Sequence, residues 1–86
     1  MKYIVRWRQA AEDDLLNLWL DSSTDREDIA RVALEIDRRL KIDAHLQGES
    51  REDRRRILFV EAYAVTFEVY QGEGIARVLA IWRAHS

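Results

Sequence analysis

Residues 54–83 read RRRILFVEAYAVTFEVYQGEGIARVLAIWR and contain three runs typical of β-strands. Residues 57–60 are apolar and rich in strand formers, and apolar side chains alternate with smaller or polar ones over residues 63–70. Residues 71–74 supply a turn, because glycine adopts positive φ angles without steric cost. Residues 75–82 are apolar on both faces with one exception, which predicts the central and most covered strand. The stretch therefore predicts an antiparallel meander with one face that needs a cover.

The sequence before the meander predicts a strand followed by a helix. Over residues 2–8 a tyrosine, a valine and a tryptophan alternate with an isoleucine and two arginines, so we expect the first set to face the core. From Gln9 to about Ser22, apolar residues recur at the spacing of a helix face. Leu16 and Leu20 widen this apolar stripe, so we expect the helix to contact two neighbouring elements.

A second helix is predicted from Asp25 to about Leu46. Thr24 and Glu27 have the spacing of a capping box, which marks a helix start. Gly48 is a candidate for the residue that stops the helix. A short loop joins the two helices, which predicts an antiparallel hairpin. The predicted buried stripe of the second helix consists of Ile29, Val32, Ala33, Ile36, Leu40 and Ala44.

The order of elements predicts a single α+β domain over residues 1–86, in the order β-α-α-β-β-β. The helix hairpin packs on one face of a mainly antiparallel sheet, and the polar segment 49–53 is expected to be a loop. The other face of the sheet is left open to solvent. We expect this open face to carry Arg6, Arg8, Arg77 and Tyr70.

Length and composition restrict the class of protein. The chain has 86 residues, enough for one domain with a small core, and no cysteine, which excludes disulfides and thiolate metal sites. No segment reaches the roughly 20 apolar residues of a membrane span, and the charged first eight residues are unlike a signal peptide. We expect a cytoplasmic protein without membrane contact. The sequence has no glycine-rich phosphate loop and no His-x-x-x-His pair, so no cofactor or metal is expected.

Charge is divided unevenly along the chain. Residues 9–50 carry 11 acidic and 5 basic side chains, whereas the remaining residues carry 9 basic and 5 acidic ones. The helical part is therefore acidic and the strand part basic, so the sheet could face phosphate groups. The alternative interpretation is a mixed-charge, solvated exterior on both parts.

Four stretches, taken in order, resemble the RelE/ParE superfamily, the toxins of bacterial type II toxin–antitoxin modules. They are YIVRW followed by AAEDDL (residues 3–7 and 10–15), the long second helix, RRILFV with YAVTFEV (residues 55–69), and IARVLAIWR (residues 75–83). The resemblance implies a cognate antitoxin as partner, whose C-terminal segment packs into the groove beside the helix hairpin and across the sheet. It leaves open whether the toxin forms a homodimer.

The resemblance also implies a set of candidate catalytic residues. RelE-type members cut messenger RNA on the ribosome by attack of a 2′-hydroxyl on the adjacent phosphate, which requires proton transfer and cations. Arg54 and Arg56 are two residues apart at a strand entrance and could face one phosphate. Arg83 occupies the family's basic position after the last strand. His85 would share its face, and histidine titrates near neutral pH.

Other interpretations of these residues stand beside the catalytic one. Three arginines before a strand are more often a solvated sheet edge than a site, and His85 is the penultimate residue. His45 is placed late in the second helix, where the helix dipole favours it without any function. The tryptophans are interpreted as aromatics of the core or of a groove: Trp7, Trp19 and Trp82.

Two alternative functions follow from the same resemblance. ParE-type members have the same fold without catalytic residues and inhibit DNA gyrase. This sequence has only two lysines, a net charge of −2 and no tyrosine near its C-terminus, all unlike ribosome-dependent members. A non-toxic relative that only binds a partner is the third possibility, because the fold is shared more widely than the activity.

Overall fold

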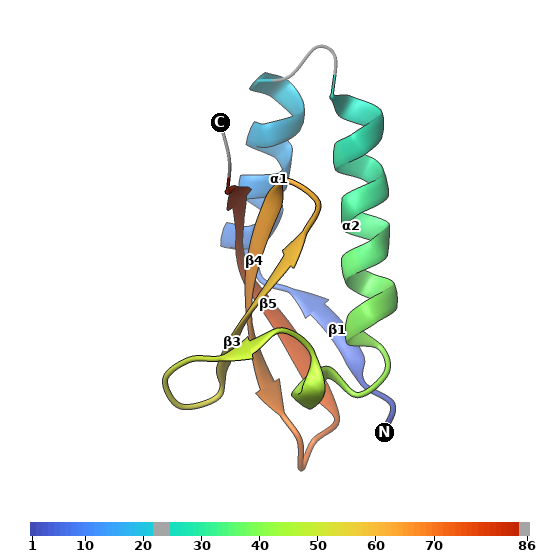
Figure 1. The fold of residues 1–86 in the computed structure, drawn as a ribbon, viewed down its shortest axis with the longest axis vertical. Helices are drawn as coiled ribbons and strands as arrows, with labels where there is room; N and C mark the ends of the chain where they lie inside the picture. Colours follow the sequence, from blue (N-terminus) through green and yellow to red (C-terminus); the bar gives the residue numbers. More distant parts are fainter. Residues whose placement is uncertain (22–24, 85–86) are drawn as a thin grey trace.

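The computed structural model describes residues 1–21 and 25–84 and has the predicted α+β architecture (Figure 1). The two predicted helices and four predicted strands are present. One further strand of two residues forms in the segment expected to be a polar loop. The elements are β1 (Ile4–Trp7), α1 (Gln9–Asp21), α2 (Arg26–Leu40), the 3-10 helix η1 (Ala44–Leu46), β2 (Glu49–Ser50), β3 (Arg55–Val60), β4 (Tyr63–Tyr70) and β5 (Ile75–Arg83).

The five strands form one mixed sheet in the order β1-β5-β4-β3-β2. β1 runs parallel to β5, and all other neighbours are antiparallel. The central strand is β4, so the prediction that residues 75–82 would be central was wrong. A β-bulge at Leu79 leaves that residue without a partner on β4. The bulge interrupts the alternation of inward and outward side chains along β5, and for this reason its sequence looks apolar on both faces.

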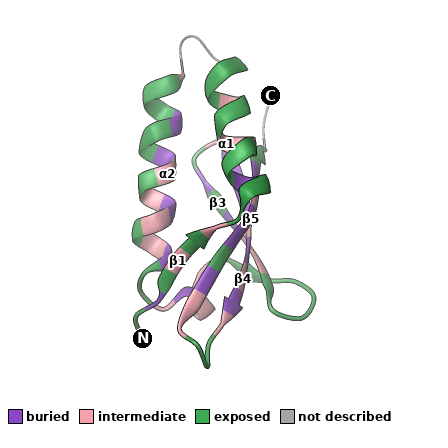
Figure 2. Cartoon of the chain, turned by 180° about the vertical axis from the view of Figure 1, so that it is seen from behind, coloured by how far each residue is buried: buried purple, intermediate pink, exposed green. Residues whose placement is uncertain are grey.

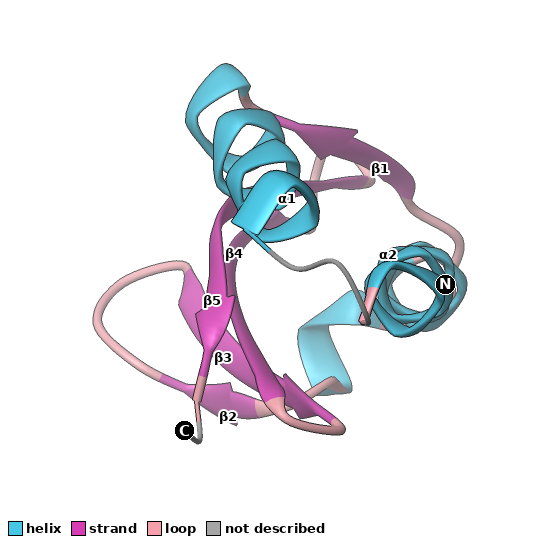
Figure 3. Cartoon of the chain, turned by 90° about the horizontal axis from the view of Figure 1, so that it is seen from above, coloured by secondary structure: helices cyan, strands magenta, loops and turns pink. Residues whose placement is uncertain are grey.

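The core lies between the helices and one face of the sheet (Figures 2 and 3). Alternate residues of β4, from Tyr63 to Val69, point into it and are buried, as period-2 patterning predicts. The predicted stripe of α2 meets them and continues past the end of the helix to the buried Ala44. In β1 and the residues next to it, Tyr3, Val5 and Trp7 face the core while Arg6 and Arg8 are exposed, as predicted.

The helix α2 ends at Leu40 rather than near Leu46. The chain then turns through Asp43, which has a φ of 51°, before the short η1. This turn lets the first residues of the chain pair with the segment after the helix: Lys2 forms a β-bridge with Ile42, and the Tyr3 amide donates to the Lys41 carbonyl at 2.8 Å. A longer helix would remove these hydrogen bonds.

Gly48 therefore does not stop the helix, and the prediction that it would was wrong. It has a φ of +64°, and a Cβ atom added there would lie 2.1 Å from the carbonyl oxygen of Ile57. The residue is glycine because β2 and β3 approach each other so closely at this point.

Helix α1 lies beside the part of β5 that β1 does not reach (Figures 1 and 2). The helix contacts both β5 and α2, so the prediction of two neighbouring elements is confirmed. Leu16 and Leu20, which were expected to widen its buried stripe, are instead 54% and 61% exposed. With Trp19, these residues form what we call the apolar strip of α1.

The predicted capping box falls partly outside the described residues, because Thr24 is not among them. Asp25 is the residue before α2, and it makes no side-chain capping hydrogen bond. Within residues 1–21 and 25–84, no helix is long and apolar enough to cross a membrane.

Candidate binding surface on the open face of the sheet

A row of four charged side chains crosses the open face of the sheet, and we call it the basic row. Arg6 on β1, Arg77 on β5, Glu68 on β4 and Arg55 on β3 are in register with one another. Residues directly opposite on neighbouring strands point to the same face, so three guanidinium groups flank a single carboxylate. The predicted open face thus exists and carries net positive charge.

Tyr70 extends this charged region toward the end of the sheet. Its ring lies between two guanidinium groups, with the Cζ atom of Arg54 5.2 Å and that of Arg77 5.4 Å from the ring centroid. Both distances are in the range of cation–π contacts. The Tyr70 hydroxyl donates to the Glu68 carboxylate at 3.1 Å, so it engages the row's one acidic side chain.

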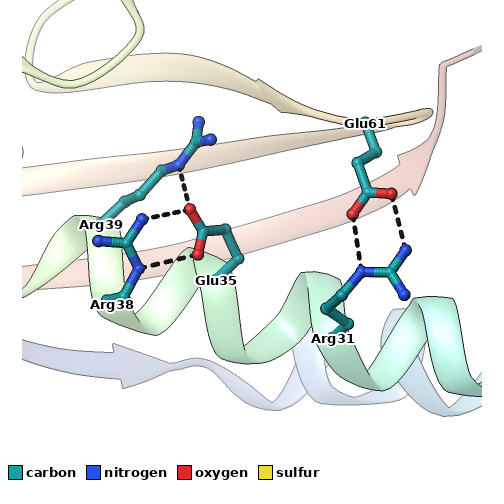
Figure 4. Close-up of polar contacts among 5 residues, drawn as sticks. All are labelled: Arg31, Glu35, Arg38, Arg39 and Glu61. Carbon is teal, nitrogen blue, oxygen red and sulfur yellow. Dashed lines mark hydrogen bonds and ion pairs between the residues drawn. The ribbon is translucent and has the colours of Figure 1, made fainter.

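Three arginines of α2, namely Arg31, Arg38 and Arg39, are paired with carboxylates, in contrast to those of the basic row. Arg31 on α2 reaches Glu61 in the β3–β4 turn at 2.8 Å, and Glu35 accepts from both Arg38 and Arg39 (Figure 4). No carboxylate among the described residues forms an ion pair with the basic-row arginines. This difference, rather than the number of arginines, makes the open face the more basic one.

An aromatic region occupies the other half of the open face. Phe59 on β3 and Trp82 on β5 are both in register with Ala64 on β4. Phe59 is 53% and Trp82 40% exposed, while Ala64 between them is fully buried beneath them. We call Phe59 and Trp82 the aromatic pair. Exposed aromatic side chains of this size are typical of a surface that binds another molecule.

Arg54 and Arg56, two of the candidate catalytic residues, lie together. Both line a hollow of about 310 Å³ at the end of the sheet near the N-terminus. Arg56 is held firmly, since its Nε donates to the Gln47 carbonyl at 2.7 Å and its Nη2 to the Gly48 carbonyl at 3.1 Å. Arg54 lies at the rim, where the hollow meets Tyr70.

Arg83 is not near them. Its Nη2 donates at 2.9 Å both to the Asp25 carboxylate and to the Tyr63 hydroxyl, and its guanidinium lies over the Tyr63 ring. Tyr63 begins β4 and Tyr70 ends it, and this places Arg83 about 23 Å from Arg54 at the usual rise of a strand. His85 lies outside the described residues.

His45 is a member of the hollow that sequence reasoning did not assign to a site. It was placed late in a continuous helix, where the helix dipole would favour it without any function. The early end of α2 and the turn at Asp43 bring it back over the sheet. No local pattern in the sequence signals this turn, because the residue at the positive φ is an aspartate rather than a glycine.

No group of three or more His, Cys, Asp or Glu side chains that could hold a metal ion occurs among the described residues. The described residues offer two kinds of surface instead. The apolar strip of α1 and the aromatic pair are exposed apolar surfaces, and the basic row and the hollow beside it are cationic.

Comparison with known proteins supports the fold. No protein-family model matches the sequence, and no curated protein matches it significantly. Solved structures do match. A chain of the RelBE2 toxin–antitoxin complex from Mycobacterium tuberculosis superimposes with a TM-score of 0.75 at 15% identity, covering 96% of this chain and 92% of that one.

Two further structures agree. A chain of the chromosomal ParDE toxin–antitoxin system from P. aeruginosa gives a TM-score of 0.72 at 19% identity, covering 98% of both chains. The isolated E. coli RelE toxin gives 0.62 at 16% identity, covering 98% of this chain and 86% of that one. The chain therefore has the fold of the RelE/ParE superfamily, as the resemblance in its sequence predicted.

Proposed function

We propose that this protein is the toxin of a type II toxin–antitoxin pair. The observation that carries the proposal is the match of nearly the whole chain, without large insertions on either side, to chains of the RelBE2 and ParDE systems. The proposal includes a small antitoxin as partner, and it is independent of which cellular process the toxin blocks.

The apolar strip of α1 supports such a partner. Leu16, Trp19 and Leu20 are exposed, and Leu16 and Trp19 line a shallow, mostly apolar hollow of about 320 Å³ together with Glu12 and Leu15. An amphipathic helix or an extended segment of an antitoxin would bury this strip. A domain of this size has a small core of its own, so burial against a partner would add substantially to its stability.

For the mode of toxicity, we propose inhibition by binding, with DNA gyrase as the target class. The supporting observation is that Arg83 is tied to Asp25 and Tyr63, far from Arg54 and Arg56, so the four residues predicted for catalysis do not form one site. The aromatic pair instead offers an exposed apolar surface beside a basic one, which is suited to docking on a macromolecule.

Cleavage of messenger RNA on the ribosome is the second candidate. It is favoured by one observation: Arg54 and Arg56 line the same hollow as a histidine, His45. Two guanidinium groups could stabilise charge on a phosphate, and an imidazole could transfer a proton to or from the 2′-hydroxyl or the leaving oxygen.

Induced expression in a bacterial host tests these functions. Translation and DNA synthesis should be followed separately after induction. We expect DNA synthesis to stop first, a DNA-damage response to follow, and co-expression of the protein encoded by the adjacent reading frame to restore growth. Translation arrest as the first event would favour RNA cleavage, and harmless expression of folded protein would contradict the toxin function.

Variants separate the two modes further. Replacing the aromatic pair (Phe59→Ala with Trp82→Ala) should abolish toxicity by binding, whereas Arg83→Ala and His85→Ala should leave it intact. For a nuclease the result would be reversed: the substitutions at Arg83 or His85 would relieve growth arrest. Leu16→Ser with Leu20→Ser should leave toxicity unchanged but weaken rescue by the antitoxin. Circular dichroism of each purified variant controls for folding.

A further inference from the structure

The hollow beside Arg54 has the chemistry of an anion site. Its polar lining comes from His45, Ser50, Asp53, Arg54, Arg56 and Gln71. These side chains reach it from four places in the chain: η1, β2, the turn and strand that carry the arginines, and the turn after β4. Two guanidinium groups, an imidazole, a hydroxyl and a side-chain amide face one carboxylate. Hydrogen-bond donors and positive charge therefore predominate.

Arg56 is positioned in advance by the main chain. Its Nε and Nη2 donate to the carbonyls of Gln47 and Gly48, and its Nη1 has no hydrogen-bond partner among the described residues. A guanidinium that is fixed in this way loses little side-chain entropy when it binds a ligand. Arg54 is also held in place, because its guanidinium group contacts the ring of Tyr70 beside the hollow.

His45 is oriented by a buried tyrosine. The Tyr3 hydroxyl lies 2.7 Å from Nδ1 of His45. Burial raises the pKa of the Tyr3 hydroxyl, so this group keeps its proton at neutral pH and can donate it to Nδ1. When the Tyr3 hydroxyl donates, the ring hydrogen of a neutral His45 resides on Nε2, which has no partner in the part of the chain that the structure describes. The tautomer that leaves Nε2–H as a donor is the one that suits an anion.

We propose that this hollow binds the phosphate group of a small phosphomonoester. A phosphomonoester carries a charge near −2 at neutral pH, which two guanidinium groups match better than they match the −1 of a phosphodiester. Guanidinium groups also bind phosphate oxygens with two parallel hydrogen bonds. The volume of about 310 Å³ is at the lower end for small-molecule sites and is suited to a phosphate with its attached sugar. The site goes beyond the proposed toxin function and inhibition by binding, which need neither it nor its ligand, although it shares Arg54, Arg56 and His45 with the second candidate function, RNA cleavage.

Titration of the purified protein with inorganic phosphate and with AMP tests the proposal. Binding is followed by calorimetry and by the ring resonances of His45 in NMR spectra. We expect both probes to shift the His45 resonances, and AMP to bind more tightly because its ribose occupies the hollow. His45→Gln should weaken AMP binding while the fold stays intact. Unchanged His45 resonances at saturating AMP would overturn the proposal.

A matched pair of variants separates a built site from general attraction of anions. Arg54→Met and Arg55→Met remove the same charge from adjacent residues, but only Arg54 lines the hollow. We expect Arg54→Met to weaken AMP binding at least tenfold and Arg55→Met to weaken it less than twofold. Equal losses would show that the ligand responds to net charge alone, and the specific site would be refuted.

The source of the phosphate group is tested with short oligonucleotides. An oligonucleotide with a 5′-phosphate should compete with AMP, whereas the same strand with a 5′-hydroxyl should not. Equal competition by both strands would mean that the backbone phosphodiester is the ligand, and would overturn the choice of a monoester. Because these measurements use purified protein, their failure leaves the toxin function untouched, and loss of toxicity in cells says nothing about them.

Discussion

At the scale of single residues, Gly48 is the glycine least able to accept a side chain. It combines a φ of +64° with a main-chain approach to Ile57 that leaves no room for a Cβ atom. Its carbonyl also accepts from Arg56, so the residue helps to position an arginine that lines the hollow. A local backbone requirement is thereby linked to the placement of a functional arginine.

Gly48→Ala should lower the free energy of unfolding by about 2–3 kcal/mol, because the new methyl group meets a main-chain carbonyl and the φ angle is unfavourable. Gly72→Ala is the control, since nothing lies within 4 Å of a Cβ atom there. Urea denaturation monitored by circular dichroism measures both. Similar stabilities for the two variants would show that the loop at Gly48 relaxes freely.

Glu35 predicts how stability depends on pH. Hydrogen bonds from Arg38, and next from Arg39, lower the pKa of the Glu35 carboxyl from 4.5 to about 2. Because the folded-state pKa lies below the unfolded one, the ionised form stabilises the fold above pH 4.5, and this contribution is lost as the pH falls toward 2. Wild type should therefore lose more stability than Glu35→Gln between pH 5 and pH 2.5. Parallel denaturation curves for the two proteins would contradict the assignment.

At the scale of elements, β5 shows how an unfinished strand edge is completed. β1 pairs with it only as far as Val78. Beyond that point, Arg8 Nε donates to the Leu79 carbonyl at 2.9 Å, and the Ile81 amide donates to the Asp14 carboxylate at 3.2 Å. Two side chains thus replace the missing part of β1, which protects the edge from pairing with another chain.

Asp14→Ala should cost about 1–2 kcal/mol of stability, because the half-buried amide of Ile81 loses its acceptor. Asp14→Asn keeps an acceptor oxygen and should retain most of the stability. Hydrogen exchange at the Ile81 amide reports the effect directly: it should accelerate in Asp14→Ala and change little in Asp14→Asn. Equal exchange in both variants would mean that α1 itself shields the edge.

The elements also show how far the sequence could predict this molecule. The period-2 alternation of β4 identified its buried face correctly, because a sheet with one covered side imposes that pattern. The end of α2 was missed, since hydrophobic spacing continues through Ala44 although the helix does not. A two-residue strand such as β2 has too few residues to produce a pattern.

Predictions for the candidate site depended on long-range geometry. Arg54 and Arg56 were placed together because their separation is local. The distance to Arg83 and the arrival of His45 depend on strand register and on the turn at Asp43, which no short stretch of sequence encodes. The basic open face was predicted from strand alternation, but the pairing of the helix-layer arginines required side-chain positions.

At the scale of the whole molecule, α1 and the open sheet face each carry exposed apolar side chains. Leu16, Leu20, Phe59 and Trp82 are each at least 40% exposed, and so contribute little to the stability of the isolated chain. Such groups are retained at a cost in solubility. They are best explained as contact points for other molecules.

Replacing Phe59 and Trp82 together by alanine should therefore lower the free energy of unfolding by less than about 1 kcal/mol, the scale of cross-strand surface contacts. Phe67→Ala removes a fully buried ring from the same sheet and should cost about 3–5 kcal/mol. Thermal unfolding of the variants checks the contrast. A large loss in the double variant would identify the pair as structural and remove its support for a binding role.

The separation of paired from unpaired arginines gives the molecule an electric dipole whose positive end is the sheet and whose negative end is the acid-rich helix layer. In dilute salt, such a dipole turns an approaching molecule before any contact is made and can speed encounter by an order of magnitude or more. At physiological ionic strength its reach shrinks to about 8 Å. A polyanionic target would thus approach the sheet, and a cationic partner would approach the helix layer. Two ligands of opposite charge could therefore bind the same small protein without competing for one side.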